Sequence, residues 1–445
     1  MEHPSPSNTA SVADPKVPSA SEWKSVARQA ALPVLVALAL RLAVVAFLYP
    51  DRMNPRRAHW PFAYEVGKVA SAIASGRGFS DPYFAQTGPT ALMGPVYPYL
   101  LAGVFRVFGI YSAASAIVAL SLGSLFSALT CVPVFLLARE TFGERVARYA
   151  AWAWALFPYA IFFAAERIWE TCLTTLLVSC LVAMTVCLGR TARTAAWIGF
   201  GLVWGLAGLT SPSALSLLPF LGGWACYRLR ARGEKWMGGA IAAAVAMVCV
   251  MLPWGVRNYR TFHKVIPVRD NFWQLVYIGN HGETRLYPVF PGIPPTSEAQ
   301  EQEFNRLGEI QYAAAKKRAA VQYITAHPGW VAVMTLRRVV YEWTGAWSLP
   351  QGGLAENFDP DQPFDPAHVI LYTAISVLAF LGLLRAFAER VDTRWIFAFV
   401  LGCFPVVYYL TLPTPHYRHP IDPEIVILAV YAVATWRCVD LKPNT

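Results

Sequence analysis

Charged residues are scarce in this chain, and their scarcity limits the kind of protein that it can be. They make up 14% of the 445 residues, whereas hydrophobic residues make up 56%. Soluble domains carry about 25% charged residues, so we expect an integral membrane protein. The net charge of +10 does not indicate nucleic-acid binding, because the basic residues fall in short loops between apolar runs, as the positive-inside rule requires.

The sequence also lacks the short motifs of several protein classes. No CxxC pair occurs among the 8 cysteines, which lie mostly in or beside apolar segments and indicate packing rather than zinc binding. No glycine-rich phosphate loop of the Walker or Rossmann type is present, which argues against ATP hydrolysis. Residues 1–22 have no apolar core, and the first apolar run, 31–49, has no small-residue cleavage site after it, so we expect no cleaved signal peptide.

Apolar runs of membrane-spanning length are what the chain does contain. In lipid the backbone must satisfy its own hydrogen bonds, so an apolar run of about 20 residues predicts a helix. The sequence predicts about ten transmembrane helices, over residues 31–49, 113–137, 147–164, 171–188, 195–210, 213–227, 237–255, 366–385, 395–411 and 421–436.

The basic loops predict the orientation of these spans. If the N-terminus is cytoplasmic, every short basic loop falls on the cytoplasmic side. The apolar run 92–108 must then not cross, since counting it would invert every later loop. Because it contains Pro95, Pro98 and Arg106, we expect a helix that lies at the membrane interface.

Four parts follow from this topology. Residues 1–30 are expected to be a disordered cytoplasmic N-terminus, and 31–255 a transmembrane core that includes the first outer loop, 50–93. Residues 256–365 are expected to form a small extramembrane α-rich insert, and 366–437 the C-terminal transmembrane helices. The fold class is therefore an all-α polytopic protein, which we place in the inner (plasma) membrane.

The first outer loop contains a specific series of motifs. Glu65 follows the first span and begins an alanine-containing helical pattern. The turn Gly76-Arg77-Gly78-Phe79 and the helix start Pro95-Val96-Tyr97-Pro98 come next. This series resembles the GT-C glycosyltransferases, in particular the family 39 branch related to protein O-mannosyltransferases and bacterial aminoarabinose–lipid A transferases. The resemblance covers about residues 30–437 and implies a GT-C-like fold with interfacial helices in the first outer loop.

The resemblance implies catalytic roles for two carboxylates. In these enzymes the first-loop acid, usually Asp, lies at the acceptor as general base, and its position here is occupied by Glu65. An acid at the start of the fourth span, here Glu170, points into the same cavity. A carboxylate accelerates attack because the acceptor hydroxyl becomes acidic as its new bond forms. The alternatives are a solvated helix residue for Glu65, and a salt bridge to Arg167 or simple snorkelling for Glu170.

Arginines on the outer side are expected to hold the lipid phosphate of the donor. The positive-inside rule disfavours arginine there, and the guanidinium fork pairs with phosphate bidentately. Binding of anionic lipid headgroups is the alternative. We expect Arg418, Arg257 and Tyr417 at the donor phosphate, and Tyr64, Tyr97, Asn258 and His416 in the substrate cavity.

These observations predict an inverting glycosyltransferase. It would move a sugar from a polyprenyl-phosphate donor, similar to undecaprenyl phosphate, to a protein, lipid or glycan acceptor on the extracytoplasmic face. No cofactor is expected, and a divalent metal is not favoured because His59, His416 and His419 lie on different loops without ligand spacing.

Two other functions stay open at this point. A lipid-linked glycan flippase or transporter would need charge within the membrane and often repeated halves. The predicted spans carry little charge and show no repeat, which disfavours it. A non-catalytic GT-C-like protein that only binds lipid-linked glycan is the second alternative, because Glu65 replaces the usual Asp.

Overall fold

The computed structural model describes residues 20–52, 64–83, 85–282, 284, 294, 297–345 and 366–435. Over these residues the chain is helical and has no β-strand, apart from one isolated bridge between Ser80 and Pro89. The prediction of an all-α protein is therefore confirmed. The predictions that concern His59, residues 1–19 and residues 346–365 lie outside the described residues.

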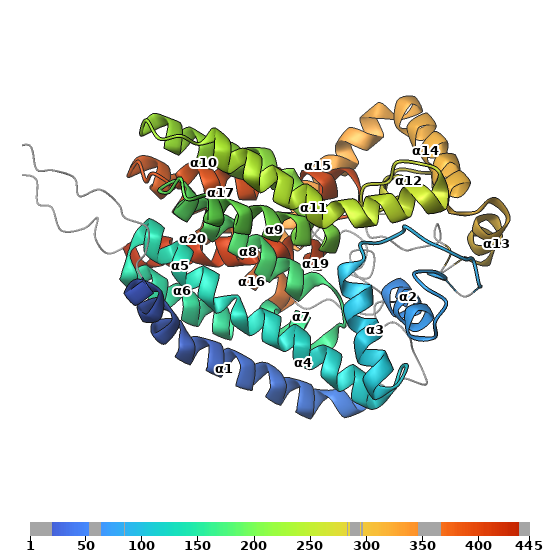
Figure 1. Ribbon diagram of the computed structural model, residues 1–445, viewed down its shortest axis with the longest axis horizontal. Helices are drawn as coiled ribbons and strands as arrows, with labels where there is room; N and C mark the ends of the chain where they lie inside the picture. The colour runs from blue at the N-terminus through green and yellow to red at the C-terminus, as the bar shows by residue number, and fades with distance from the viewer. Residues whose placement is uncertain are drawn as a thin grey trace, which may run out of the picture.

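Each predicted span corresponds to one helix or to two consecutive helices of a bundle (Figure 1). The single helices are α1 (Ala20–Arg52), α8 (Thr171–Leu188), α9 (Thr194–Thr210), α11 (Met237–Phe262), α16 (Pro366–Ala388) and α20 (Asp422–Thr435). The pairs are α4 (Ala113–Leu129) with α5 (Cys131–Phe142), α6 (Glu144–Leu156) with α7 (Pro158–Glu166), η2 (Pro212–Leu217) with α10 (Leu218–Ala231), and α17 (Arg394–Cys403) with α18 (Val406–Leu410).

Two boundaries differ from the predicted ones. Residues 20–30, which were expected to be disordered, form the first turns of α1. Helix α11 continues to Phe262, past the predicted end of the span at 255. By length and composition, five segments of the described chain are able to cross a membrane: Arg28–Phe47, Ala113–Phe142, Thr171–Leu188, Met237–Phe262 and Ala367–Ala388.

Proline explains why several of the other predicted spans are broken. Pro158 begins α7, Pro219 lies in the first turn of α10 after η2, and Pro405 lies directly before α18. Proline lacks an N–H group and its ring clashes with the preceding turn, so it is accepted where a helix starts and interrupts one elsewhere. The two halves of each broken span therefore meet at an angle and leave backbone carbonyls that need new partners.

Arg41 supplies such partners inside the bundle. Its side chain on α1 is fully buried, and it donates hydrogen bonds to the carbonyls of Trp154 and Ala155 at the end of α6, at 3.3 and 2.9 Å. It also donates to Ser127 Oγ on α4, at 3.0 Å. A buried charge is tolerated when its donors are satisfied in this way. Arg41 thus joins three helices at the break between α6 and α7.

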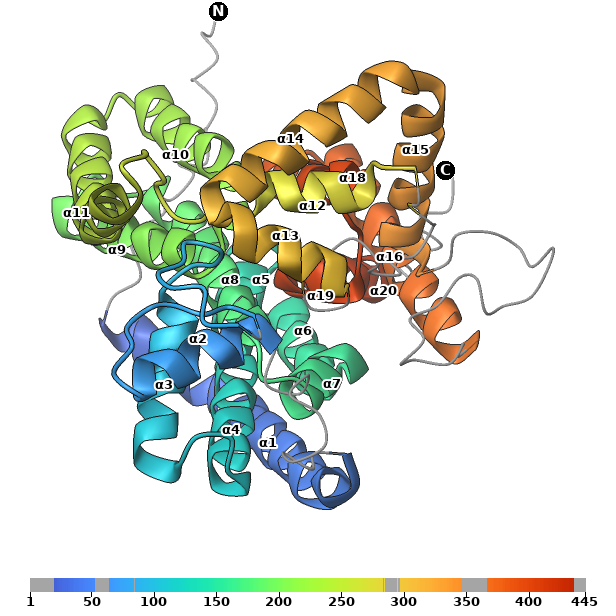
Figure 2. The same cartoon turned by 90° about the vertical axis from the view of Figure 1, so that its right-hand side faces the viewer.

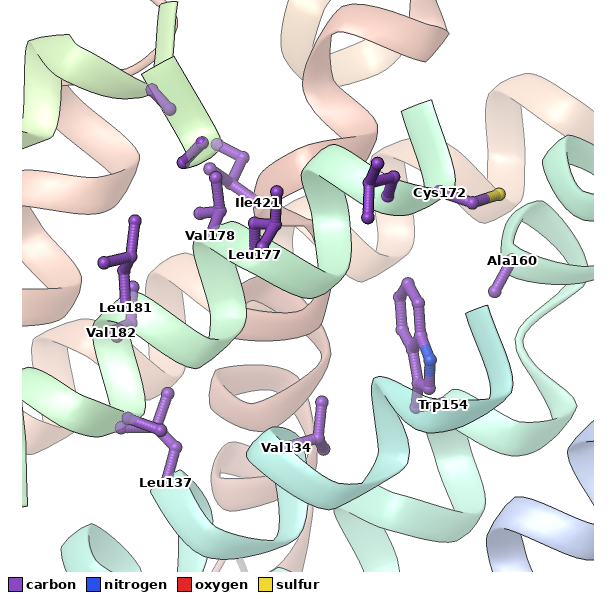
Figure 3. Close-up of a cluster of buried hydrophobic side chains, with 14 of the residues drawn as sticks. Val134, Leu137, Trp154, Ala160, Cys172, Leu177, Val178, Leu181, Val182 and Ile421 are labelled. Atoms are coloured by element: carbon purple, nitrogen blue, oxygen red, sulfur yellow. The ribbon is translucent and has the colours of Figure 1, made fainter. Parts of the chain in front are cut away.

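Close helix packing forms the rest of the core. A Cβ atom on Gly201 would lie 2.0 Å from the Ala243 carbonyl oxygen, so only glycine allows α9 to approach α11 this closely. Larger side chains fill the centre of the bundle. Figure 3 shows Val134, Trp154, Leu181 and Ile421, from α5, α6, α8 and the short helix η5 (His419–Ile421) respectively, converging on one region.

One end of the bundle carries the extramembrane helices (Figure 1). From the first outer loop come α2 (Tyr64–Ala74) and α3 (Val96–Phe108), and from the second outer segment come α12 (Phe272–Gly279), α13 (Glu298–Leu307), α14 (Glu309–Ala326) and α15 (Pro328–Thr344). With 13 residues, α3 reaches only about 20 Å, too short to cross the hydrocarbon core of about 30 Å. It packs against α2 and α4, in keeping with an interfacial helix.

Candidate active site

Glu65 lies at the extramembrane end, in the first turn of α2, where the helix N-terminus favours a negative charge. Its side chain is half-buried. Burial raises the pKa of Glu65 to about 7, against the opposing effect of its backbone hydrogen bond, and Glu170 adds to the increase. The two carboxylates expected to act together are therefore close enough to influence each other's charge.

Glu170 precedes α8 directly, at the position before Thr171. Burial raises its pKa, and the guanidinium of Arg269 opposes that increase. Glu170 Oε2 is buried and makes no hydrogen bond within the described residues. A buried carboxylate oxygen without a protein partner is available to a substrate hydroxyl.

Tyr417 approaches both carboxylates from the short helix α19 (Pro415–Arg418). Burial raises the pKa of Tyr417 to about 12, with Glu170 and Glu65 contributing and Arg269 opposing. Its ring stacks on Tyr408 at a centroid distance of 4.6 Å. The phenol is therefore held in a fixed orientation beside the two acids.

Other predicted cavity residues surround this centre. The ring of His416 stacks on Trp169, next to Glu170, at 4.7 Å, and burial lowers the pKa of His416 to about 3. Tyr97 on α3 is buried, and its pKa is raised by burial and by Glu170. Tyr64 is also buried, but it packs in a separate cluster with Tyr83, Leu92, Phe304 and Tyr312.

Arg269 is the cation of this site, and it was missed in the sequence. It lies in the segment between α11 and α12, half-buried, and it lowers the pKa of both Glu170 and Tyr417. The argument used for the other arginines also applies to Arg269. The positive-inside rule disfavours a basic residue on the outer side of a membrane protein, so an arginine found there is expected to have a role. It stands apart from the motifs on which the resemblance rested, and so it was not singled out.

Asn258 holds the turn that presents Arg269. The fully buried Asn258 Nδ2 donates to the carbonyls of Ile266 and Val268, at 3.0 and 3.4 Å, and Trp254 Nε1 also donates to Val268, at 2.8 Å. These bonds tie the end of α11 to the segment that follows it. Asn258 was expected in the substrate cavity, and the structure instead shows it supporting the backbone next to Arg269.

Arg257 is bonded to the first outer loop. Its Nη1 donates to the Thr90 carbonyl at 2.6 Å and to Asn258 Oδ1 at 3.0 Å, and its Nη2 donates to the Phe79 carbonyl at 2.8 Å. The guanidinium also lies 4.8 Å from the centroid of the Trp254 ring. Protein oxygens thus accept from both Nη atoms, and the expectation that Arg257 binds the donor phosphate stays a prediction.

Arg418 is also placed differently from the expectation. Its side chain has no exposed surface, and its Nε pairs with Asp422 Oδ1 at 3.0 Å. Its Nη1 donates to Ser376 Oγ at 2.9 Å, and the guanidinium lies 3.2 Å from the Tyr372 ring centroid. An arginine enclosed by α16 and α20 in this way cannot contact a lipid phosphate. The cation that interacts with Glu170 and Tyr417 is instead Arg269.

The second outer segment fastens the first outer loop over this site (Figure 2). Glu309, at the start of α14, accepts a hydrogen bond from Thr90 Oγ1 and another from Ala91 N, at 2.7 Å. Asp270 N donates to the Ala91 carbonyl at 2.9 Å. Gln274 Nε2 donates to the hydroxyl of Tyr83 at 3.2 Å. The loop 79–92 is therefore positioned by contacts that are distant in sequence.

Replacing Glu309 by alanine should loosen this loop. Thr90 Oγ1 and the Ala91 N–H would lose their acceptor, and an unsatisfied buried donor costs about 1–3 kcal/mol. We expect hydrogen–deuterium exchange of amides in 79–92 to accelerate by roughly 5- to 150-fold. Glu298→Ala, on the exposed side of α13, is the control. Unchanged exchange in the Glu309 variant would show that the loop is held by other contacts.

No three His, Cys, Asp or Glu side chains lie close enough to hold a metal ion in the described part of the chain. His416 stacks on Trp169, and His419 pairs through Nδ1 with Asp422 Oδ2 at 2.9 Å. The expected independence from metal and cofactors stays a prediction.

Comparison with known proteins relates this geometry to a family. Residues 91–254 match the model of the family described as dolichyl-phosphate-mannose-protein mannosyltransferase. The matched segment contains Tyr97 and Glu170 but not Glu65, Arg269 or Tyr417. A search of curated proteins gave no match.

Solved structures show the fold over nearly the whole chain. The archaeal oligosaccharyltransferase AglB from Archaeoglobus fulgidus, in complex with an inhibitory peptide and a dolichol-phosphate, is 14% identical with a TM-score of 0.53, over 96% of this chain and 53% of that one. The apo form of the Archaeoglobus fulgidus oligosaccharyltransferase gives 14% identity and a TM-score of 0.52, over 92% and 52%. ArnT from Cupriavidus metallidurans, bound to undecaprenyl phosphate, is 14% identical with a TM-score of 0.37, over 96% and 82%.

The similarity to the oligosaccharyltransferase confirms the GT-C-like fold that the resemblance implied. This chain spans about half the length of the oligosaccharyltransferases that it matches. It is an all-α polytopic membrane protein whose membrane helices are arranged as in a GT-C glycosyltransferase.

Proposed function

We propose that this chain is an inverting glycosyltransferase that moves a sugar from a polyprenyl-phosphate donor to an acceptor hydroxyl on the extracytoplasmic face. The observation that carries the proposal is the convergence of Glu65, Glu170, Tyr417 and Arg269, from four separate segments, at the extramembrane end of the bundle. The acceptor belongs to a protein, a lipid or a glycan.

The reaction assigns a role to each of these groups. The acceptor oxygen forms a bond to the anomeric carbon on the face opposite the phosphate, and the bond from that carbon to the phosphate oxygen breaks. The acceptor proton passes to the Glu65 carboxylate. The electron pair of the broken bond leaves on the polyprenyl phosphate, whose developing charge Arg269 stabilises. Glu170 orients the acceptor, and Tyr417 donates a hydrogen bond to the phosphate.

The distribution of basic residues supports the proposed orientation. Arginines cluster at the bundle end opposite the site, at the ends of α8 and α10 and in the turn after α16; they include Arg190, Arg228, Arg230 and Arg390. By the positive-inside rule this end is cytoplasmic. The site then faces the outside of an inner (plasma) membrane.

A transporter is the second candidate, and one observation favours it. The bundle buries more charge than the sequence led us to expect, since Arg418, Asp422 and Glu424 each have 0% exposure. Charges inside a membrane protein often mark transport pathways. Purified protein reconstituted in sealed vesicles that contain polyprenyl-phosphate sugars distinguishes the two functions. We expect release of free polyprenyl phosphate, detected by mass spectrometry; movement across the bilayer without bond cleavage would reject the enzyme.

Neutralising Arg269 should weaken use of the donor. Loss of one preorganised charge donor typically lowers turnover by about 10²–10³-fold, and we expect Arg269→Gln to lower kcat/KM for the donor by a similar factor. The KM for the acceptor should change little. Arg260→Gln, an exposed position in the last turn of α11, is the matched control. A change of less than about threefold in the Arg269 variant would remove this residue from the phosphate site.

The rate should depend on pH through Glu65. A general base acts only when ionised, so protonation below its pKa of about 7 reduces activity. We expect log kcat/KM to rise by about one per pH unit in the acid range and to level above about pH 7. Because Glu65 and Glu170 interact, the inflection belongs to the pair. A rate that stays constant between pH 5 and 8 would contradict a base with this pKa.

A further inference from the structure

A groove lies at the bundle end opposite the site, between α10 and α17. It has a volume of about 470 Å³. An adjoining cavity of about 230 Å³ shares Trp224, Arg228 and Asp392 with it. None of the residues placed in the proposed reaction lines either space, so the groove calls for its own explanation.

Along both helices, the side chains that line the groove change from apolar to aromatic and polar and then to cationic. On α10 the chain passes from Phe220 to Trp224 and then to Arg228 at the end of the helix. On α17, which runs the opposite way beside it, the matching order is Phe399, Trp395 and Arg394. The groove is thus apolar at depth, aromatic further out and cationic at its mouth.

Contacts between the two helices fix these layers. The rings of Phe220 and Phe399 lie 5.0 Å apart, and Trp395 is near Phe399 at 6.2 Å. At the mouth, the guanidinium of Arg228 lies 5.6 Å from the Trp224 ring and pairs with Asp392 at 2.9 Å. Trp395 and Tyr227 are 48% and 67% exposed, so these aromatic side chains face the surrounding lipid rather than the protein core.

The charges at the mouth favour an anion. Arg228 and Arg394 line the groove together with one acid, Asp392, whose side chain is 71% exposed. Arg394 Nη1 donates to the Val391 carbonyl at 2.8 Å, and this bond fixes a guanidinium that lines the groove. A phosphate at the mouth is able to contact the guanidinium groups of Arg228 and Arg394. It competes with the exposed carboxylate of Asp392 for Arg228 only. Arginine forks pair with phosphate bidentately.

We infer that this groove binds an anionic glycerophospholipid. Its phosphate lies between Arg228 and Arg394, and one acyl chain lies along Phe220 and Phe399. The sequence of cation, amphipathic aromatic ring and apolar ring matches the headgroup, interface and tail of such a lipid. Free phosphate would gain nothing from the apolar floor, and a zwitterionic lipid would gain less from the arginines.

Lipid titration of the purified full-length protein tests this site. Native mass spectrometry in detergent is carried out with dioleoyl phosphatidylglycerol, dioleoyl phosphatidylcholine, undecaprenyl phosphate and inorganic phosphate as separate probes. We expect phosphatidylglycerol to bind and phosphatidylcholine and inorganic phosphate to bind at least roughly tenfold more weakly. Undecaprenyl phosphate is also expected at the proposed donor site beside Arg269, so the groove variant separates the two sites. Undecaprenyl phosphate binding that is tighter than phosphatidylglycerol binding and is lost when Arg228 and Arg394 are both replaced by glutamine would identify a carrier-lipid site in the groove and overturn the proposal.

Replacing the arginines of the groove shows whether phosphatidylglycerol binds there. Arg228→Gln with Arg394→Gln should weaken phosphatidylglycerol binding by roughly tenfold or more. The control Arg230→Gln, exposed on the same helix outside the groove, should not. Because Arg228 also joins α10 to Asp392, Arg394→Gln alone keeps that ion pair and should still weaken binding several-fold. Equal binding by the single variant, the double variant and the control would overturn the inference.

Discussion

Replacing Glu65 by glutamine should abolish sugar transfer while leaving the protein level unchanged. General-base catalysis contributes about 10²–10⁴-fold, and we expect turnover to fall by a factor in this range. The amide has the size of the carboxyl group but cannot accept the acceptor's proton. Glu65 is half-buried in the first turn of α2, so the fold should tolerate the change. Product formation is measured by mass spectrometry, and stability by thermal unfolding in the same detergent.

Glu298→Gln is the matched control for this result. Glu298 also lies in the first turn of an extramembrane helix, α13, but it is exposed. We expect normal turnover in this variant, which separates loss of catalysis from a general effect of removing charge at a helix N-terminus. Full activity of Glu65→Gln would reject the role of Glu65, and the non-catalytic GT-C-like protein would become the better explanation.

Replacing Arg418 by methionine should destabilise the protein strongly. The substitution removes the ion pair with Asp422 and leaves that buried carboxylate with the His419 contact but without its arginine. Breaking a buried pair from one side costs about 3–5 kcal/mol. We therefore expect a large decrease in the thermal unfolding temperature, or loss of the protein from the membrane fraction.

Asp422, the partner of Arg418, allows a test of whether loss of the ion pair causes the destabilisation. Asp422→Asn combined with Arg418→Met removes both charges, and replacing a buried ion pair completely is often close to neutral. We expect the double variant to recover much of the lost stability, a coupling that single variants cannot show. If Arg418→Met is stable and only raises the KM for the donor, Arg418 binds the phosphate after all.

Loss of Arg418 should also affect activity, because Arg418 is next to Tyr417 in the chain. Tyr417 and Arg418 are consecutive in α19, so the same short helix presents one side chain to the site and the other to the bundle. The ion pair with Asp422 at the start of α20 fixes the orientation of that helix. Arg418 is thus a positioning residue for Tyr417, although no substrate reaches it.

Several features of this protein are determined by the sequence alone. Low charge and long apolar runs specify membrane helices, because backbone groups in lipid must bond within their own segment. The same runs predicted the order of the helices. The basic loops that follow 92–108, together with its prolines and Arg106, indicated that α3 does not cross. The motifs around Glu65 and Tyr97 were enough to indicate the GT-C fold. Each motif consists of residues that are close in the sequence, so it is recognisable without the long-range contacts.

The identity of the cation at the site is decided by tertiary structure. Arg257, Arg269 and Arg418 have the same chemistry and similar positions near the ends of membrane helices. Their surroundings differ: carbonyls of the first outer loop occupy Arg257, Asp422 and Ser376 enclose Arg418, and Arg269 is the one of the three that lowers the pKa of Glu170 and Tyr417. Which partners surround an arginine depends on how distant segments pack. The sequence therefore names the candidates, and the packing of the folded chain selects among them.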